Sequence, residues 1–102
     1  MTTRHGMLNR ITTKAGQRDA VVKVLISAAR LQCAMPGCDI YVIHTSPDDV
    51  NLVWVTEVWR TKEAHEASLK SADVRALIEK GRPMIASIDQ TITVPVGGKG
   101  IT

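Results

Sequence analysis

Three residues combine a polar or aromatic side chain with a setting that could form a site: Asn9, His65 and Trp59. Asn9 is flanked two residues away on either side by Met7 and Ile11, so a strand would place it on an apolar face. An amide in that position is either satisfied within the protein or available to donate a hydrogen bond to a ligand oxygen. Both interpretations of Asn9 are open from the sequence.

His65 stands four residues before Leu69, which places both side chains on one face of a predicted helix. If that face turns toward a sheet, the imidazole could accept a proton near neutral pH, and the alternative is a partly exposed structural histidine. Trp59 ends a predicted strand, and its indole could form a pocket wall or simply pack in a core or an interface. Together the three residues could supply a donor, a base and an aromatic surface.

Four weaker candidates could bind a substrate: Tyr41, His44, Ser68 and Arg75. Tyr41 and His44 are three residues apart in one predicted strand and therefore lie on opposite faces of it. Arg75 is spaced with Glu79 and Arg82 for an ion-pair face in water, which is its alternative interpretation.

Motifs that would require a metal or a cofactor are incomplete. His65-Glu66 resembles the start of a zinc-protease helix, but Leu69 occupies the position of the second histidine. The Gly-Gly-Lys-Gly stretch at 97–100 lacks the spacing of a phosphate loop. Cys33 and Cys38 are too few for a disulfide scaffold, and we interpret Cys33 as a small buried residue rather than a nucleophile. We therefore expect neither a metal nor a cofactor.

The composition is that of one ordinary globular domain. The chain has 102 residues, of which 44% are hydrophobic and 23% are charged. The net charge of +3 comes from scattered basic residues with acids between them, and the aromatic content is only 3%. This pattern disfavours nucleic-acid binding. No apolar stretch approaches the length of a membrane span, so we expect a cytoplasmic protein with reduced thiols and no membrane contact.

The predicted elements follow one another in a simple order. The sequence predicts strands at residues 7–13, 38–45, 52–59 and 87–96, and helices at 17–34, 62–70 and 72–80. Gly16 can cap the first helix, Thr61 and Ser71 can cap the other two, and a short turn is expected at 84–86. The order is the βαββαβ arrangement of an α+β, ferredoxin-like fold with a four-stranded antiparallel sheet. We expect a single domain over 1–102, with a core at about 6–96 and a flexible tail at 97–102.

Both faces of the predicted sheet are apolar. In the second strand Ile40 and Val42 alternate with Tyr41 and Ile43, and the third strand shows the same pattern. The helices can cover only one face, and the other would leave a large apolar patch in water. We therefore predict a homodimer in which the sheets of two copies pack together.

The order of elements and several short motifs resemble the antibiotic biosynthesis monooxygenase (ABM) family. The similarity covers about residues 6–96 and rests on four motifs: Glu57-x-Trp59, the helical run at 61–71, Val-Arg-Ala-Leu at 74–77 and the Lys-Ala-Gly turn at 14–16. This resemblance implies a dimeric α+β barrel. It also implies a cofactor-independent oxygenase that acts with dioxygen on a phenol, a quinol or a polycyclic aromatic. In that scheme His65 would be the base, Asn9 the donor to the developing anion, and Trp59 a pocket wall.

The sequence also departs from relatives within that resemblance. Ser68 occupies a position where members often carry a histidine. The haem-degrading branch pairs a first-strand asparagine, matched by Asn9, with a tryptophan where Ser68 stands and with an axial histidine that residues 77–79 do not offer. Haem degradation is therefore disfavoured. The alternative function is a non-catalytic barrel that binds a small ligand or serves in a stress response.

Overall fold

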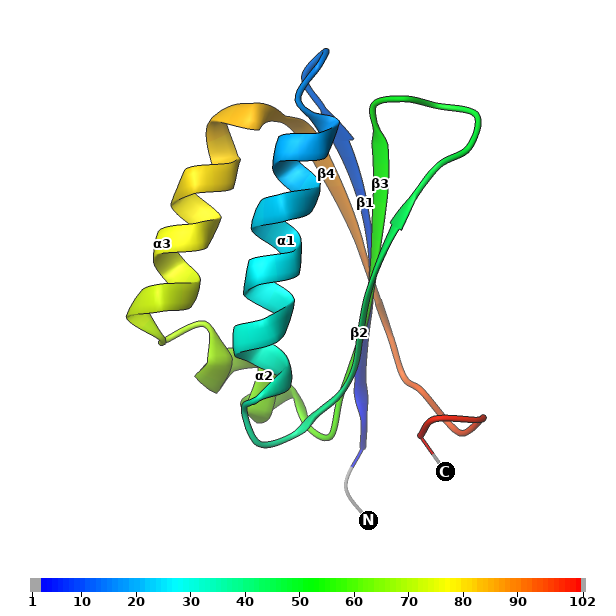
Figure 1. Cartoon of the computed structure of the whole chain (residues 1–102). Coiled ribbons are helices and arrows are strands. Elements are labelled where there is room, and N and C mark those ends of the chain that lie inside the picture. The colour runs from blue at the N-terminus through cyan, green and yellow to red at the C-terminus, as the bar shows by residue number, and fades with distance from the viewer. Residues whose placement is uncertain (1–2, 102) are drawn as a thin grey trace.

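The computed structural model describes residues 3–101, which form one sheet with helices on one side of it (Figure 1). In chain order the elements are β1 (His5–Thr13), α1 (Arg18–Cys33), β2 (Cys38–Thr45), β3 (Leu52–Trp59), α2 (Lys62–Ser68), α3 (Ala72–Gly81), the 3₁₀ turn η1 (Arg82–Met84) and β4 (Ile85–Thr93). The strands are antiparallel in the order β2-β3-β1-β4. The predicted α+β, ferredoxin-like fold is confirmed.

Strand bounds were predicted best where turn chemistry marks both ends. β2 and β3 have the predicted bounds, because Gly37, with a φ of 89°, precedes β2, and the Ser46 side chain closes the hairpin turn. β1 begins at His5 instead of residue 7 because pairing with Trp59 extends it. The prediction for β4 is displaced: the strand pairs with β1 already at Ile85 and ends at Thr93, and η1 likewise precedes the expected turn.

Side-chain caps divide the second helical region as predicted. Thr61 Oγ1 accepts a hydrogen bond from the Ala64 N–H at 3.0 Å, and Ser71 Oγ accepts one from the Val74 N–H at 3.4 Å. The expected cap at Gly16 is wrong by one residue. Gln17 takes the N-cap position of α1, and Gly16 instead adopts a left-handed conformation with a φ of 76° in the preceding turn.

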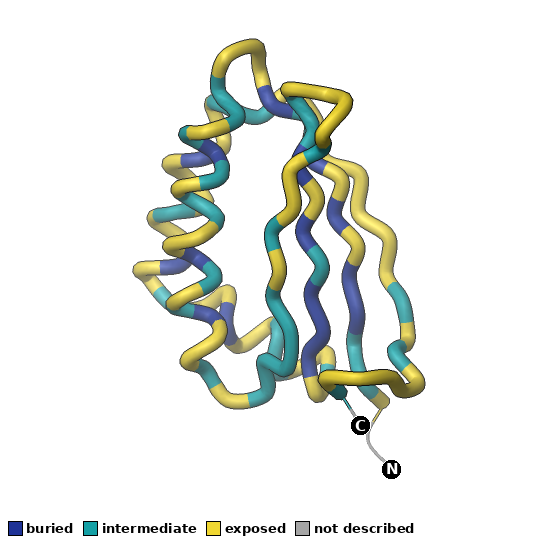
Figure 2. Tube along the Cα trace, turned by 45° about the vertical axis from the view of Figure 1, so that its right-hand side comes forward, coloured by how far each residue is buried: buried dark blue, intermediate teal, exposed yellow. Residues whose placement is uncertain are grey.

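Buried residues are concentrated in the central strands β1 and β3, where they alternate in part with exposed ones, and β4 is mostly exposed (Figure 2). The face toward the helices buries Met7 and Ile11 of β1 together with Val53, Val55 and Trp59 of β3. A cluster of Ile11, Val53 and Val55 packs against partly buried residues of α1, β2 and β4. The opposite face exposes side chains of β1, β2 and β3 that include Leu8, Val42 and Trp54. The inner face therefore carries the core, and the outer face is uncovered in the monomer.

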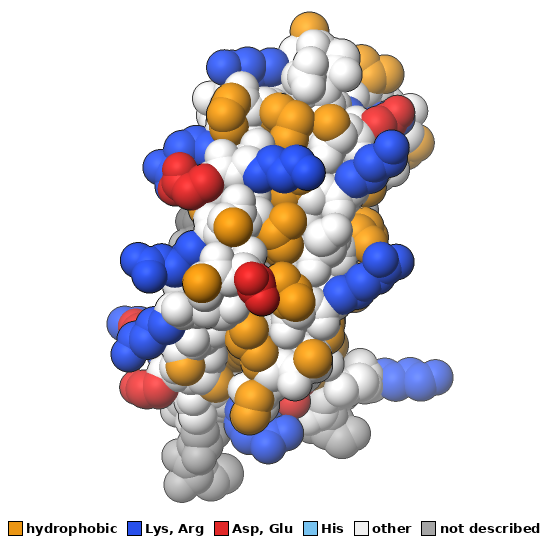
Figure 3. Space-filling view, turned by 60° about the vertical axis from the view of Figure 1, so that its left-hand side comes forward, with side chains coloured by type: hydrophobic (Ala, Val, Ile, Leu, Met, Phe, Trp, Pro, Cys, Tyr) orange, Lys and Arg blue, Asp and Glu red, His pale blue; other side chains and the backbone are white. Residues whose placement is uncertain are grey.

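The helical side of the molecule is mixed in character. Figure 3 shows Lys and Arg side chains spread over this face with hydrophobic and acidic side chains between them, in agreement with the scattered charge of the sequence. None of the helices in the described part of the chain is long and apolar enough to cross a membrane.

The two cysteines flank the loop between α1 and β2. Cys33 is exposed at the end of α1, so its interpretation as a buried small residue is wrong. The last turn of α1 carries the buried Gln32 toward the core, and the next residue along the helix is rotated away from it. Cys38 is partly buried.

Candidate active site

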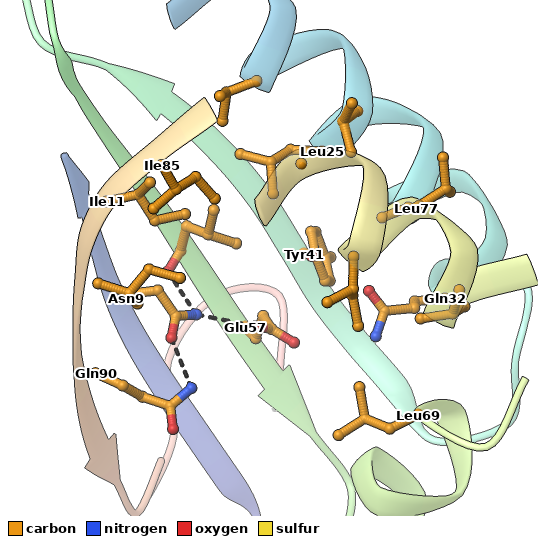
Figure 4. A pocket seen from close by; sticks show the side chains of 18 of the residues that line it. Asn9, Ile11, Leu25, Gln32, Tyr41, Glu57, Leu69, Leu77, Ile85 and Gln90 are labelled. Atoms are coloured by element: carbon orange, nitrogen blue, oxygen red, sulfur yellow. Dashed lines mark hydrogen bonds between the residues drawn. The ribbon is translucent and has the colours of Figure 1, made fainter. Parts of the chain in front are cut away.

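A cavity of about 350 Å³ lies between the inner face of the sheet and the helices α1 and α3. Its walls are mostly apolar, with Ile11 and Ile85 on the sheet side and Leu25 and Leu77 on the helix side (Figure 4). The volume is within the range of small-ligand pockets. Polar side chains also line it: Asn9, Gln32, Tyr41, Glu57, His65 and Gln90. A mostly apolar pocket with a few polar side chains is the usual form of a small-molecule site.

Glu57 is the central polar residue of the cavity. It lies on β3 with 7% of its surface exposed, and its carboxylate accepts two hydrogen bonds. Trp59 Nε1 donates to Oε1 at 3.0 Å, and Asn9 Nδ2 donates to Oε2 at 2.9 Å. Burial raises the pKa of Glu57, and the hydrogen bonds from Trp59 and Asn9 offset this only in part.

The Asn9 side chain bridges two strands. β1 places Asn9 opposite Val55 of β3 on one side and opposite Gln90 of β4 on the other. Its Oδ1 accepts a hydrogen bond from Gln90 Nε2 at 2.8 Å, and its Nδ2 donates to Glu57 (Figure 4). The amide of Asn9 is therefore satisfied within the protein, and the residue also lines the cavity.

His65 approaches this cluster from α2. Its Nε2 is 4.0 Å from Glu57 Oε1, which is too long for a hydrogen bond but close enough for a strong charge interaction once the imidazole is protonated. The ring packs edge-on against Trp59, with ring centres 5.5 Å apart, and lies 5.7 Å from the ring of His5. Burial lowers the pKa of His65, the nearby His5 lowers it further, and Glu66 raises it. The imidazole is therefore held neutral at neutral pH.

The three predicted catalytic residues, Asn9, His65 and Trp59, meet around Glu57. Glu57 itself was missed as a site residue by the sequence analysis, as was Gln90. The available signal was a carboxylate within the apolar strand Val-Thr-Glu-Val-Trp, in register with the buried Val55 and Trp59.

Tyr41 of β2 also lines the cavity and is the neighbour of Glu57 in the sheet. Burial and the negative charge of Glu57 raise the pKa of the Tyr41 phenol, so it stays protonated at neutral pH. Tyr41 can therefore act toward a ligand as a neutral hydroxyl group.

The other predicted binding residues do not line the cavity. Ser68 is buried behind it, where its Oγ donates to the His65 carbonyl oxygen at 2.6 Å and accepts from Gln32 Nε2 at 3.1 Å. His44 lies on the outer face of the sheet, with Nε2 3.2 Å from Thr56 Oγ1. Arg75 is exposed on α3, and Glu79 of the expected ion-pair face contacts Arg82 at 3.0 Å. Ser68 thus supports the helix of His65, and the other two belong to other surfaces.

Within residues 3–101, no three His, Cys, Asp or Glu side chains gather as metal ligands would.

Comparison with known proteins places the chain in a family. A sequence model of the antibiotic biosynthesis monooxygenase family, ABM, matches residues 4–80, and the chain belongs to that family. No curated protein matches the sequence significantly.

Solved structures share the fold over nearly the whole chain. One from Chloroflexus aurantiacus J-10-fl, named for the same family, is 41% identical with a TM-score of 0.89 and covers 97% of this chain and 99% of its own. PA3566 from Pseudomonas aeruginosa is 20% identical with a TM-score of 0.86, over 95% of this chain and 98% of its own. Rv0793 from Mycobacterium tuberculosis is 16% identical with a TM-score of 0.83, over 94% of this chain and 98% of its own. The latter two establish similarity of fold alone.

Proposed function

We propose that the protein is a cytoplasmic, cofactor-independent monooxygenase that oxidises a small phenolic, quinol or polycyclic aromatic substrate with dioxygen. One observation carries the proposal: the His65 imidazole, whose pKa is lowered by burial, lies 4.0 Å from the buried Glu57 side chain beside an apolar cavity. A neutral imidazole can take the proton of an aromatic hydroxyl group, and the carboxylate stabilises the imidazolium that forms.

The cavity suits a flat aromatic ring with a polar end. Apolar side chains such as Ile11, Leu25 and Leu77 would hold the ring by burial. Asn9 and Tyr41 would supply hydrogen-bonding groups near the ring hydroxyl. A phenolate formed there is poorly solvated, and it is therefore a stronger electron donor than the same anion in water.

The reaction then needs only substrate, dioxygen and a proton carrier. The phenolate passes one electron to dioxygen, and the resulting radical pair joins to form a carbon–oxygen bond at the ring. His65 returns its proton to the peroxide. The ring C–H proton is then lost as the O–O bond breaks, which leaves a quinone and releases one water molecule. One oxygen atom stays on the product and the other leaves in the water.

We also propose that the working unit is a homodimer. The outer face of the sheet exposes 42% of Leu8, 44% of Val42 and 39% of Trp54. A second copy packed on this face would remove those side chains from water, with a gain of about 25 cal/mol for each Å² of apolar surface buried. The dimeric barrel implied by the family resemblance is consistent with this arrangement.

The test is dioxygen uptake by the purified protein across a panel of hydroquinones, naphthols and fused-ring phenols. Uptake with at least one member, accompanied by quinone formation, is the expected result. Panel members that bind, as judged by a change in tryptophan fluorescence, without any uptake would instead support the non-catalytic binding module.

A further inference from the structure

The two ends of the α1–β2 loop bring the cysteines together. Cys33 ends α1 and Cys38 begins β2, and their Sγ atoms are 3.8 Å apart. Both thiols are free; Cys33 is exposed and Cys38 is partly buried. The chain reverses between them through Pro36 and Gly37, and the φ of 89° at Gly37 belongs to the left-handed region that favours glycine. The loop therefore holds two sulfur atoms in contact beside solvent.

We propose that Cys33 and Cys38 form a redox-active pair that hydrogen peroxide converts reversibly into an intramolecular disulfide. The Cys33 thiolate attacks the peroxide, whose O–O bond breaks, and yields a sulfenic acid and one water molecule. The Cys38 sulfur then attacks the Cys33 sulfur, and the sulfenic hydroxyl leaves as a second water molecule with the Cys38 thiol proton. The two sulfur atoms lose two electrons in total, and the peroxide gains them.

The different surroundings of the two thiols determine which of them reacts with peroxide first. Cys33 is exposed, so it meets a dissolved oxidant first. Burial, together with Cys33, Glu57 and Asp39, raises the pKa of the Cys38 thiol to about 12. Cys38 therefore remains a protonated thiol and reacts slowly with free peroxide. Its contact with Cys33 makes the second step intramolecular, which compensates for its low thiolate fraction. For the bond to form, the sulfur atoms must approach to about 2.05 Å, and the exposed Cys33 side chain has room to turn.

Hydrogen bonds and a close backbone contact connect the same loop to α2, the helix that carries His65. Gln32, the neighbour of Cys33, donates from Nε2 to Ser68 Oγ at 3.1 Å, and Ser68 Oγ donates to the His65 carbonyl oxygen at 2.6 Å. A Cβ placed on Gly37 would lie only 2.6 Å from Ala64 Cβ, so the loop backbone touches α2 directly. The Gln32–Ser68 hydrogen bond and the close approach of Gly37 to Ala64 join this loop to α2, so any backbone movement that accompanies disulfide closure reaches that helix. Oxidation of the pair would therefore displace His65.

The disulfide is tested by treating the reduced protein with graded hydrogen peroxide, alkylating the remaining thiols and measuring the intact mass. We expect both alkylation sites to disappear together, with a loss of two hydrogen atoms, a monomer on a non-reducing gel and full reversal by dithiothreitol. In Cys38→Ser, a sulfenic acid at Cys33 should be trapped by dimedone. In Cys33→Ser, peroxide consumption should be at least tenfold slower. Sulfinic or sulfonic acid at Cys33 in the wild type, or a disulfide between two chains, would overturn the proposal.

The link to α2 is tested by nuclear magnetic resonance of the His65 ring in the reduced and peroxide-treated protein. A change in the His65 Hε1 resonance is expected in the wild type, with none in the double variant Cys33→Ser/Cys38→Ser under the same peroxide treatment. An unchanged His65 resonance in a fully oxidised sample would refute the link. These readouts require no oxygenase activity, so they remain decisive if the proposed function fails.

Discussion

Burial acts on Glu57 and His65 in opposite senses, raising the pKa of the carboxyl group and lowering that of the imidazole. Both shifts favour the uncharged forms, because each charge has lost its water. His65 Nε2 and Glu57 Oε1 lie 4.0 Å apart, so a proton received by His65 creates an ion pair wherever Glu57 is ionised. His65 therefore takes a proton from a substrate more readily beside an ionised Glu57 than it would alone.

Replacing His65 with alanine should lower kcat/KM for the oxygen-consuming reaction by about 10²–10⁴-fold, the usual contribution of a general base. The matched control is His44→Ala, since that histidine lies on the outer face of the sheet and does not line the cavity. Steady-state kinetics at neutral pH compare the two variants. Equal losses in both would show that His65 has no special role.

The pH profile of the wild type should report the same group. Because burial and His5 lower the pKa of His65 below its ordinary 6.5, activity should rise with pH through that lowered value and be level at neutrality. The measurement is kcat/KM against pH, since that ratio follows the free enzyme. An ascending limb centred above neutrality would be the contrary result.

The stability of the Glu57→Gln variant relative to the wild type should increase as the pH rises from about 4 to about 7. The pKa of the Glu57 carboxyl is raised in the folded protein, so the folded state holds its proton more tightly than the unfolded chain. The stability contributed by that protonation is present below the unfolded pKa and is lost as pH rises through the folded pKa. Thermal unfolding of both proteins at the two pH values gives the comparison, and a difference in Tm independent of pH would contradict it.

At the scale of residues, the sequence predicted the residues that surround Glu57 but not Glu57 itself. Asn9 stood out because it interrupts an apolar strand face, and His65 because of its helix position. Glu57 is recognisable in the sequence as a carboxylate within an apolar strand. Its partners come from β1, β3 and α2, however, and only the folded chain brings their side chains to one carboxylate.

At the scale of elements, α2 is held in place by a buried hydrogen bond to a neighbouring helix, because it is short. It spans only Lys62–Ser68, too short to be stable alone. Ser68 ties it to α1 through Gln32, which reaches into the same interior. The sequence predicted the helix and its Thr61 cap from local signals, but the Gln32–Ser68 contact joins residues 36 positions apart and had no local signal.

Ser68→Ala should therefore destabilise the fold by about 1–3 kcal/mol, because the buried Gln32 amide loses its acceptor. Ser87→Ala on exposed β4 is the matched control, with a change expected within about 0.5 kcal/mol. Urea denaturation measures both. Similar small effects in the two variants would mean that water replaces Ser68 without cost.

The bounds of the strands show a second limit of local signals. Gly37 precedes β2, Ser46 and Pro47 lie in the loop between β2 and β3, and both strands were predicted at their observed ends. β4 was predicted two residues late, since its start is set by pairing with Thr13 across the sheet rather than by its own sequence.

At the scale of the whole molecule, the uncovered outer face of the sheet is the main feature that the monomer leaves unexplained. Trp54→Lys should convert the proposed dimer into a monomer, because a charge would be buried in an apolar interface. Val50→Lys is the control, since Val50 is 70% exposed in the hairpin loop and Trp54 39% exposed on the sheet. Sedimentation velocity distinguishes the two states, and a Trp54→Lys protein that sediments like the wild type would exclude this face as the interface.

In the proposed reaction, this cavity binds an aromatic substrate that dioxygen oxidises without a cofactor. The most direct measurement follows dioxygen consumption and quinone absorbance together in one sample of chelator-treated protein with an active phenol from the panel. We predict equimolar dioxygen uptake and quinone formation in the wild type and in His44→Ala, and loss of both in His65→Ala. Equal turnover in His65→Ala, or uptake with no quinone formed, would rule out the proposed reaction.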